Sequence, residues 1–460
     1  METITGTRSN QLNDLVIPAF RDQVSGKVLE PGEAGYEEAR KIWNGMINRR
    51  PKLIVQCESV KDVLEAVKFA TSNNLIVSIR GGGHNVTGNA VCDDGIMIDL
   101  SPMKNVQVDP NQRTAVAQTG ATWGDFDKAT QAFGLATTGG IISTTGIAGL
   151  TLGGGVGWLV RKLGLSCDNV IAAEVVTADG KLLVANEVEN PELFWGLRGG
   201  GGNFGIVTSL TYKLHPVSTI LGGMILHPIA EAKKVIQFYR EFMKTAPEEL
   251  TLYTSILHTP DGVQVIGFIG CYSGDMSAGE KVLRPLRDFG SPIVDLFQQQ
   301  PYLQIQTMLD APFPHGNRFY WKSGFLESLS DGAIETILTH ALKVSSPISA
   351  IILEFYGGAA LREPSSGTAF PHRVAQFDLV IISHWINPDD DEKHMEWTRS
   401  FWNEMAPFTS NRAYVNALGV EGEERVREAY GENYDRLLAL KKQYDPKNVF
   451  CMNQNINPGS

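Results

Sequence analysis

The stretch SIRGGGHNVTG, residues 78–88, decides how the first part of this chain folds. It continues an apolar run, NLIVSI at 74–79, and places three glycines directly before His84. Glycine allows the backbone to approach a neighbour closely, because it has no Cβ atom and readily adopts a positive φ. We therefore expect a loop that lies against a ligand, with His84 within reach of that ligand.

The flanking sequence predicts a helix and a strand that present this loop. Residues 59–80 begin with Ser59 as a helix N-cap, continue with apolar residues at helical spacing and end in a β-rich run. The same signals predict a helix over 123–134, begun by Thr122, and strands over 95–100, 172–178 and 205–214.

The pattern changes after about residue 216. Helical runs such as 231–245 alternate with extended runs such as 262–274 and 349–358, which predicts a second domain with an antiparallel sheet. Residues 423–450 predict two helical segments with a break near Gly431. We therefore assign the chain to the α+β class.

Composition narrows the expected partners to small molecules. The net charge of -11 over 460 residues disfavours nucleic acid and anionic membranes, since both are polyanions. No apolar run reaches the roughly 18 residues of a membrane span, and residues 1–15 lack the pattern of a signal peptide. The five cysteines form no CxxC pair, so we expect neither disulfides nor a metal site. The expectation is a cytoplasmic monomer or homodimer.

Three glycine-rich stretches compete as ligand-binding loops, at 80–88, 137–158 and 197–207. None has the strand, turn and helix that a Rossmann GxGxxG fingerprint needs, and no GxxxxGK[ST] P-loop occurs. Two interpretations stay open. Their backbone N–H groups bind an anionic group such as a pyrophosphate, or they are tight turns within a sheet.

Six motifs occur in order along the chain. They are SIRGGGHNVTG (78–88), GIMIDLSPMKNVQVD (95–109), GATWGD (120–125), TTGGIISTTGIAGLTLGGGVGWLVRKLGLSCDNV (137–170), ELFWGLRGGGGNFGIVTS (192–209) and YDPKNVFCMNQNI (444–456). With these motifs the chain resembles the FAD-linked oxidases of the berberine bridge enzyme type, within the vanillyl-alcohol-oxidase superfamily, over nearly its whole length. The resemblance implies a two-part PCMH-type FAD-binding domain over 1–215, to which 415–460 return. It also implies a substrate domain over 216–414, with an antiparallel sheet covered by helices.

The resemblance further implies that FAD is covalently attached through His84. The 8α-methyl group of the isoalloxazine ring loses a proton and becomes electrophilic, so that a neutral imidazole beside it adds to it. The family's other cofactor contacts fall at Arg80, Gly81, Gly82, Gly83, Asn85, Gly88, Gly120, Gly140, Thr145, Gly146, Gly149, Gly153, Gly154, Gly157, Asn169, Ile206, Val207, Asn448 and Asn455.

The chain departs from its relatives at several positions. Many relatives attach FAD a second time through a cysteine, but Ile142 stands at that place. Cys167 is the alternative for a second bond, although we interpret it as a small packed side chain. With a single covalent bond to FAD, the chain is similar to the bacterial 6-hydroxynicotine oxidases. Val156 and Ala417 stand where several relatives carry tyrosine.

Catalytic candidates come from the family motif and from strand parity. Oxidation of an alcohol or amine moves a hydride to flavin N5, while a base takes the O–H or N–H proton. Tyr414 and Asn416 match the family motif, and we expect Tyr414 to hydrogen-bond or deprotonate the substrate. Parity in the predicted strands adds Tyr320, Lys322 and Glu354.

A further predicted strand, 377–385, carries Asp378, Val380 and Ile382 on one face. The family's polar residue falls at Val380, so this strand is expected to supply no acid or base. The loss of polar groups at family positions favours an amine or a hydrophobic alcohol over a sugar.

The expected function is an FAD-dependent oxidase that takes a hydride from a C–OH or C–N substrate and passes electrons to O₂, giving H₂O₂. Three alternatives stay open. They are a dehydrogenase with another electron acceptor, an oxidase that cyclises a natural product, and a flavin-carrying binding protein without turnover.

Overall fold

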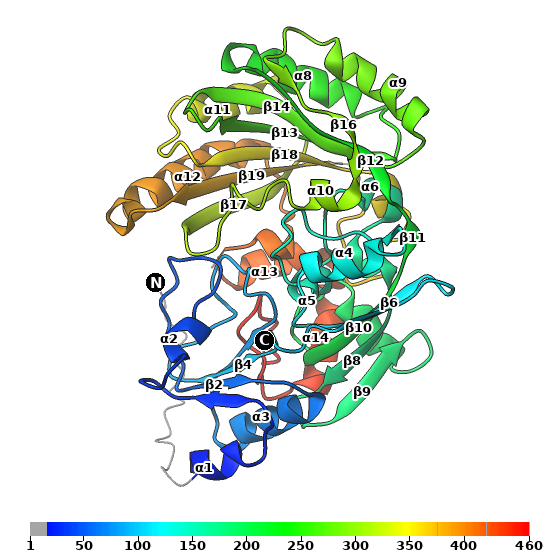
Figure 1. Ribbon diagram of the computed structural model, residues 1–460. Coiled ribbons are helices and arrows are strands. Elements are labelled where there is room, and N and C mark those ends of the chain that lie inside the picture. The colour runs from blue at the N-terminus through cyan, green and yellow to red at the C-terminus, as the bar shows by residue number, and fades with distance from the viewer. Residues whose placement is uncertain (1–15, 375, 420, 460) are drawn as a thin grey trace.

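The computed structural model describes residues 16–374, 376–419 and 421–459. The chain forms a lower body from its first half and its C-terminal end, and an upper body around one large sheet (Figure 1). Helices and antiparallel sheets occur in both bodies, which confirms the predicted α+β class.

The first sheet of the lower body presents the 80–88 loop. Its order is β1-β2-β4-β3, and β4 is parallel to both β2 and β3. Ser59 caps the following helix in a capping box with Asp62, so the predicted helix and strand are confirmed. The elements are α1 (Val16–Arg21), β1 (Lys27–Leu29), α2 (Tyr36–Ala39), β2 (Leu53–Gln56), α3 (Val60–Ser72), β3 (Val77–Arg80) and β4 (Ile96–Asp99).

The second sheet of the lower body is antiparallel, in the order β5-β6-β10-β8-β9. Thr122 caps α4 as predicted. The elements are β5 (Val106–Asp109), β6 (Thr114–Gln118), α4 (Trp123–Gln131), β7 (Leu135–Ala136), α5 (Ile147–Leu152), α6 (Val160–Leu163), η1 (Ser166–Asn169), β8 (Val170–Val176), β9 (Leu182–Asn186), α7 (Pro191–Leu197), β10 (Ile206–Lys213) and β11 (His215–Pro216), which pairs with β7.

The upper body is built on an antiparallel sheet of order β15-β12-β14-β13-β18-β19-β17, with β16 also paired to β12. Its strands are β12 (Thr219–Pro228), β13 (Leu250–His258), β14 (Gln264–Tyr272), β15 (Val294–Asp295), β16 (Gln298–Pro301), β17 (Arg318–Leu326), β18 (Ala350–Tyr356) and β19 (Gln376–Trp385). Its outer face is covered by α8 (Ala232–Phe242), α9 (Met276–Arg287), α11 (Asp331–Ala341) and α12 (Asp391–Met405) (Figure 1). Apolar residues such as Tyr239, Ile337 and Phe401 bury that face. The inner face is thereby turned toward the lower body.

The C-terminal segment returns to the lower body (Figure 1). It contains α13 (Glu423–Tyr430) and α14 (Tyr434–Tyr444), with the predicted break at Gly431. The buried ammonium of Lys441 donates to the Asp445 carboxylate at 2.7 Å and to the carbonyl oxygens of Asn203 and Phe450 at 2.9 Å. These bonds fasten the tail to the 197–207 loop. The division at residues 215 and 414 stays a prediction.

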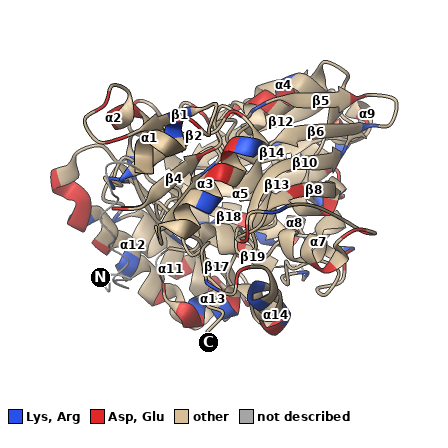
Figure 2. Ribbon diagram, turned by 90° about the horizontal axis from the view of Figure 1, so that it is seen from below, with Lys and Arg blue, Asp and Glu red and all other residues tan. Residues whose placement is uncertain are grey.

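Charged side chains of both signs lie on outer helices such as α3 and α14 (Figure 2). Within the described part of the chain, no helix combines the length and the apolar character needed to cross a bilayer.

Candidate functional site

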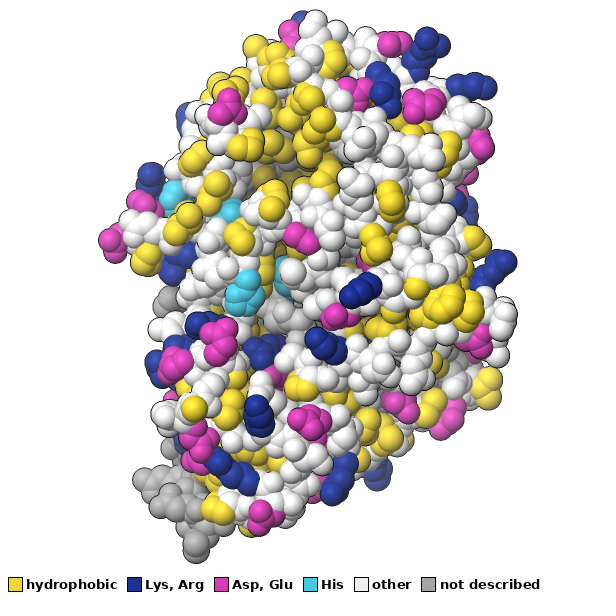
Figure 3. All heavy atoms as spheres, in the orientation of Figure 1, with side chains coloured by type: hydrophobic (Ala, Val, Ile, Leu, Met, Phe, Trp, Pro, Cys, Tyr) yellow, Lys and Arg dark blue, Asp and Glu magenta, His cyan; other side chains and the backbone are white. Residues whose placement is uncertain are grey.

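A cavity of about 410 Å³ lies where the two bodies meet. Figure 3 shows a hollow between the upper and lower bodies, with histidine side chains beside it. We call its lower side the glycine wall, formed by Gly81, Gly82, Gly83, Gly140, Gly146, Gly149, Gly201, Gly202 and Gly205. We call its upper side the sheet wall, formed by Tyr253, Trp321, Ile352, Glu354, Asp378, Val380 and Ile382.

The glycine wall is backbone without side chains. A Cβ atom at Gly82 would stand 2.3 Å from the amide nitrogen of Gly146, so these two loops require glycine where they touch. Gly83 has φ +69°, which favours glycine as well. A Cβ atom at Gly149 or Gly202 would meet no protein atom within 4 Å. There the bare backbone faces open cavity.

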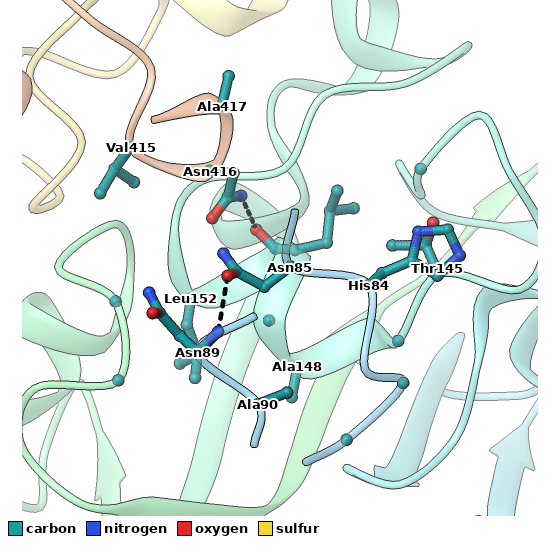
Figure 4. A pocket seen from close by; sticks show the side chains of 18 of the residues that line it. His84, Asn85, Asn89, Ala90, Thr145, Ala148, Leu152, Val415, Asn416 and Ala417 are labelled. Carbon is teal, nitrogen blue, oxygen red and sulfur yellow. Dashed lines mark hydrogen bonds between the residues drawn. The ribbon is translucent and has the colours of Figure 1, made fainter. Parts of the chain in front are cut away.

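His84 lies in the cavity with its ring fixed on two sides (Figure 4). The imidazole stacks on Trp43, with ring centroids 4.5 Å apart, and Nε2 is 2.9 Å from the hydroxyl oxygen of Thr144. Burial lowers the pKa of His84 to about 3. The imidazole is therefore neutral at physiological pH, which leaves a lone pair on one ring nitrogen.

Tyr414 and Asn416 form a hydrogen-bonded pair at the cavity. The Tyr414 hydroxyl accepts bonds from the Gly155 amide at 3.0 Å and from Asn416 Nδ2 at 2.8 Å. Asn416 Nδ2 also donates to the Leu150 carbonyl at 2.8 Å (Figure 4). Burial raises the pKa of Tyr414 far above its usual value. The phenol therefore stays protonated and suits a hydrogen-bond donor rather than a base.

The sheet wall carries two carboxyl groups. Glu354 of β18 and Asp378 of β19 stand directly opposite each other across the strands, and both line the cavity. Burial, followed by the charge of Asp378, raises the pKa of Glu354 to about 8. Burial raises the pKa of Asp378 to about 7, although the Ser323 hydroxyl donates to it at 3.0 Å. The sequence secured no acid or base on strand 377–385, and the structure places the carboxyl group of Asp378 at the cavity.

Many of the residues predicted from sequence line this one cavity. They are Gly81, Gly82, Gly83, His84, Asn85, Gly140, Thr145, Gly146, Gly149, Ile206, Val207, Glu354, Tyr414 and Asn416.

Tyr320 and Lys322 do not reach the cavity. The ring of Tyr320 lies under the Arg399 guanidinium of α12, and the Lys322 ammonium pairs with Glu421 at 2.9 Å. The parity of β17 was predicted correctly, but its other face, with Trp321, turns inward.

Arg80 and Asn169 have structural partners instead of cavity contacts. Arg80 forms an ion pair with Asp99 of β4 and donates to the carbonyl oxygens of Ala39 and Lys41. Asn169 Nδ2 donates to the carbonyl oxygens of Leu163 and Leu165, which closes the turn before β8.

Five predicted glycines act behind the wall, because a side chain there would strike another segment. A Cβ atom at Gly120 would lie 1.8 Å from the Leu100 oxygen, and one at Gly153 would lie 2.0 Å from Asn416 Oδ1. The others are Gly88, beside Ile47, Gly154, beside Phe370, and Gly157, beside Gly139. Asn448 and Asn455 also lie outside the cavity lining, and their Oδ1 atoms are buried without a hydrogen-bond partner among the described residues.

Sequence reasoning missed several cavity residues, notably Asn89, Tyr253, Trp321 and the tail residues Met452, Asn453 and Gln454. The tail was assigned to the cofactor domain. An irregular segment has no sequence period, however, so the sequence does not show which of its side chains turn inward. Nothing local in strand 250–258 distinguishes Tyr253 from an ordinary core residue.

The two positions considered for a second covalent bond, Ile142 and Cys167, differ in their access to the cavity. Ile142 stands where many relatives carry the second FAD-binding cysteine, and it lines the cavity. Cys167 is fully buried in a core cluster and does not line the cavity, and burial raises its pKa well above the usual value. A neutral buried thiol is a poor nucleophile. Within residues 16–374, 376–419 and 421–459, no cluster of His, Cys, Asp or Glu is arranged to hold a metal ion.

The residues present fit an FAD. Gly149, in the first turn of α5, and Gly202, in the 197–207 loop, leave space that a Cβ atom would fill, so phosphate groups can approach the backbone N–H groups there. Asn453 lines the cavity, and its buried Oδ1 has no hydrogen-bond partner among the described residues, so it can accept a bond from an N–H group of the cofactor.

Comparisons with known proteins agree with this geometry. Residues 51–186 match the model of an FAD binding domain, and residues 413–457 match that of berberine and berberine-like proteins. The chain is 35% identical to an FAD-linked oxidoreductase of Dictyostelium discoideum, covering 96% of this chain and 97% of that protein. It is 31% identical to (R)-6-hydroxynicotine oxidase of Paenarthrobacter nicotinovorans, covering 95% and 97%.

A solved structure, that of 6-hydroxy-D-nicotine oxidase from Arthrobacter nicotinovorans, has a TM-score of 0.87 and 29% identity, and the match covers 95% of this chain and 98% of that one. The predicted PCMH-type fold, with an antiparallel substrate sheet, is thereby confirmed.

Proposed function

Because this chain belongs to the berberine bridge enzyme-like family of FAD-linked oxidoreductases, we propose that it oxidises a small, largely apolar amine or alcohol and passes the electrons to O₂. One observation carries the proposal. A single cavity joins the glycine wall, which fits FAD, to a sheet wall that holds two carboxyl groups among apolar side chains.

We propose that His84 attaches the FAD covalently, and that this is its single covalent bond. The ring is neutral, and Trp43 and Thr144 fix its plane and one of its nitrogens. His84 would hold the flavin ring through one imidazole nitrogen, whose lone pair is available because the ring is neutral. Ile142 lines the cavity where a second bond would need cysteine.

Bound flavin supplies the electron acceptor, which takes a hydride from the substrate carbon at N5. The protein supplies proton transfer and orientation. Glu354 and Asp378 are the acceptors for the N–H or O–H proton, because their raised pKa values let them exchange it near neutral pH. Tyr414 is held by Gly155 and Asn416 so that its own proton can be donated to substrate.

The sheet wall favours an apolar substrate over a sugar. Trp321, Ile352, Val380 and Ile382 offer aromatic and aliphatic surface, whereas a sugar needs many hydrogen-bonding partners.

The test is an anaerobic screen of amines, secondary alcohols and oligosaccharides against the purified yellow protein. Bleaching of the flavin absorbance by an amine or alcohol, followed by rapid recovery on admission of air, is the expected result. Recovery only with an artificial acceptor would identify a dehydrogenase instead. A cyclised product would identify the ring-closing alternative, and no bleaching by any compound class would contradict the proposal.

A further inference from the structure

The carboxyl groups of the sheet wall belong to a continuous row across four strands. Tyr253 of β13 pairs with Glu354 of β18, Glu354 pairs with Asp378 of β19, and Asp378 pairs with Phe325 of β17. Directly opposed residues on one face have Cβ atoms roughly 5 Å apart. The two carboxyl groups are therefore neighbours by the register of the sheet.

Two members of this row have unused hydrogen-bonding groups. The carboxyl group of Glu354 has no hydrogen-bond partner among the described residues, and it lines the cavity. Tyr253 is only 3% exposed, yet its hydroxyl is buried without a partner in the described part of the chain. Burying the Tyr253 hydroxyl without a partner is costly, and the Glu354 carboxyl faces the same cavity, so this arrangement indicates a ligand that hydrogen-bonds to them.

The cavity holds no positive charge to balance the pair. Among the described lining residues, Glu354 and Asp378 are the only acidic ones, and none is lysine or arginine. Arg425 of α13 lowers the pKa of Asp378, but Glu421 and Glu428 already pair with its guanidinium.

The remaining titratable groups near the carboxyls are phenols. They are Tyr239, Tyr253, Tyr356 and Tyr414, and burial raises the pKa of each, so that all four stay neutral.

We infer that Glu354 and Asp378 together hold one negative charge and bind the substrate as an ammonium ion, whose proton they then accept. Two neighbouring buried carboxyl groups cannot both ionise easily, so the pair carries one negative charge near neutral pH. One negative charge in an apolar, aromatic cavity complements one substituted ammonium group. The inference rests on the proposed function and specifies its substrate class as an amine.

The proton and electron balance is complete. The ammonium N–H proton moves to the ionised carboxyl group, which leaves both carboxyls neutral and the amine with a free lone pair. The carbon beside nitrogen then gives its C–H bond pair, as a hydride, to the flavin. The product is an iminium ion, and the carboxyl proton returns to solvent when the product leaves.

The direct test measures ligand binding to the holoenzyme with two probes of one shape. Phenyltrimethylammonium is a permanent cation that cannot be oxidised through an N–H group, and tert-butylbenzene is its uncharged counterpart. Binding is measured by perturbation of the flavin absorbance spectrum. We expect the cation to bind about tenfold more tightly than the hydrocarbon at pH 8. We expect that preference to shrink about tenfold toward pH 6, because the pair becomes fully protonated.

Variants assign the effect to the pair. The double variant Glu354→Gln/Asp378→Asn should lower cation affinity about tenfold and leave hydrocarbon affinity within about twofold, whereas either single variant keeps one carboxyl group that can carry the charge. Asp127→Asn is the matched control, since Asp127 is an equally buried carboxyl whose pKa is raised to about 7, but it lies outside the cavity. That variant should keep the cation preference.

The outcomes separate the inference from the proposed function. Equal binding of both probes at every pH, or a preference retained in the double variant, would overturn the amine inference. Bleaching by alcohols alone would overturn it too, while supporting the oxidase. Absence of bleaching by every substrate, together with a normal cation preference, would overturn the oxidase and leave the cation site standing.

Discussion

The two walls of the cavity are built from different parts of the polypeptide. The glycine wall offers backbone, and its geometry depends on the absence of side chains at points such as Gly82 and Gly146, where two loops touch. The sheet wall offers side chains on a regular ladder, whose backbone does not require glycine at these positions. The difference teaches that the cofactor half of such a site is restricted by packing, whereas the substrate half can change by single substitutions without changing the fold.

The strongest test of this contrast adds a side chain to the glycine wall. Gly149 lies in α5 and faces open cavity, so Gly149→Leu should fill cofactor space without striking protein. Leucine is a better helix former than glycine by about 0.8 kcal/mol, so the apoprotein should fold at least as well. We expect flavin content per polypeptide to fall about tenfold or more, measured from the visible absorbance. Gly149→Ala is the control, and a fully yellow Gly149→Leu protein would break the contrast.

A smaller effect is expected at the point where the glycine loops hold His84. Thr144→Val keeps the shape of the side chain but removes the hydroxyl 2.9 Å from Nε2. Loss of one hydrogen bond should slow covalent attachment about threefold to tenfold. Acid-stable flavin is followed over time after FAD is added to apoprotein. Thr144→Ser should restore the rate, and equal rates in all three proteins would remove Thr144 from the account.

Tyr253 of the sheet wall and Tyr239 of α8, which packs on the outer face of the same sheet, form a matched pair of tyrosines. The Tyr253 hydroxyl has no partner among the described residues, whereas the Tyr239 hydroxyl donates to the carbonyl oxygens of Leu252 at 2.7 Å and Leu353 at 3.3 Å. Tyr253→Phe should slow substrate oxidation severalfold and leave the free energy of unfolding unchanged or slightly higher. Tyr239→Phe should lower that free energy by about 1 kcal/mol and leave turnover unchanged. A reversal of the two phenotypes would show that the row at Tyr253 is structural.

A buried contact outside both walls, between Asp127 and Gln306, predicts a pH dependence of stability. Asp127 of α4 accepts a hydrogen bond from Gln306 Nε2 at 2.6 Å, and both Asp127 Oδ1 and Gln306 Oε1 are buried without partners. Burial raises the pKa of Asp127 to about 7, so the folded protein binds this proton more tightly than the unfolded chain. Folding stability from this group is therefore lost as pH rises from about 4 to 7.

Asp127→Asn should remove that loss, because an amide donates to Gln306 Oε1 at every pH. We expect the free energy of unfolding of the variant to exceed that of the parent protein by on the order of 2 kcal/mol at pH 8. At pH 4 the two proteins should be equally stable. If the parent protein and the variant were equally stable at both pH values, Asp127 would be solvated and its pKa would not be raised.

The sequence could predict the glycine wall because the requirement for glycine in these loops is local. Loops such as 80–88 need glycine for positive φ and close contact, and these needs are visible in the letters themselves. The sheet wall was only half predictable. Alternation along β17 and β19 separated the faces correctly, but which face turns inward depends on α12 and on the lower body, which lie elsewhere in the chain. Tyr320 was therefore preferred to Trp321, and Asp378 was passed over for the position of Val380.

The most direct measurement of the central claim is flavin retention after acid denaturation. The parent protein, precipitated in acid and washed, should keep its yellow colour and a mass increased by one FAD. His84→Ala should release all flavin, while Cys167→Ala should keep it, because the Cys167 thiol is packed away from the cavity. Colour released from the parent protein, or kept by His84→Ala and lost from Cys167→Ala, would contradict the account.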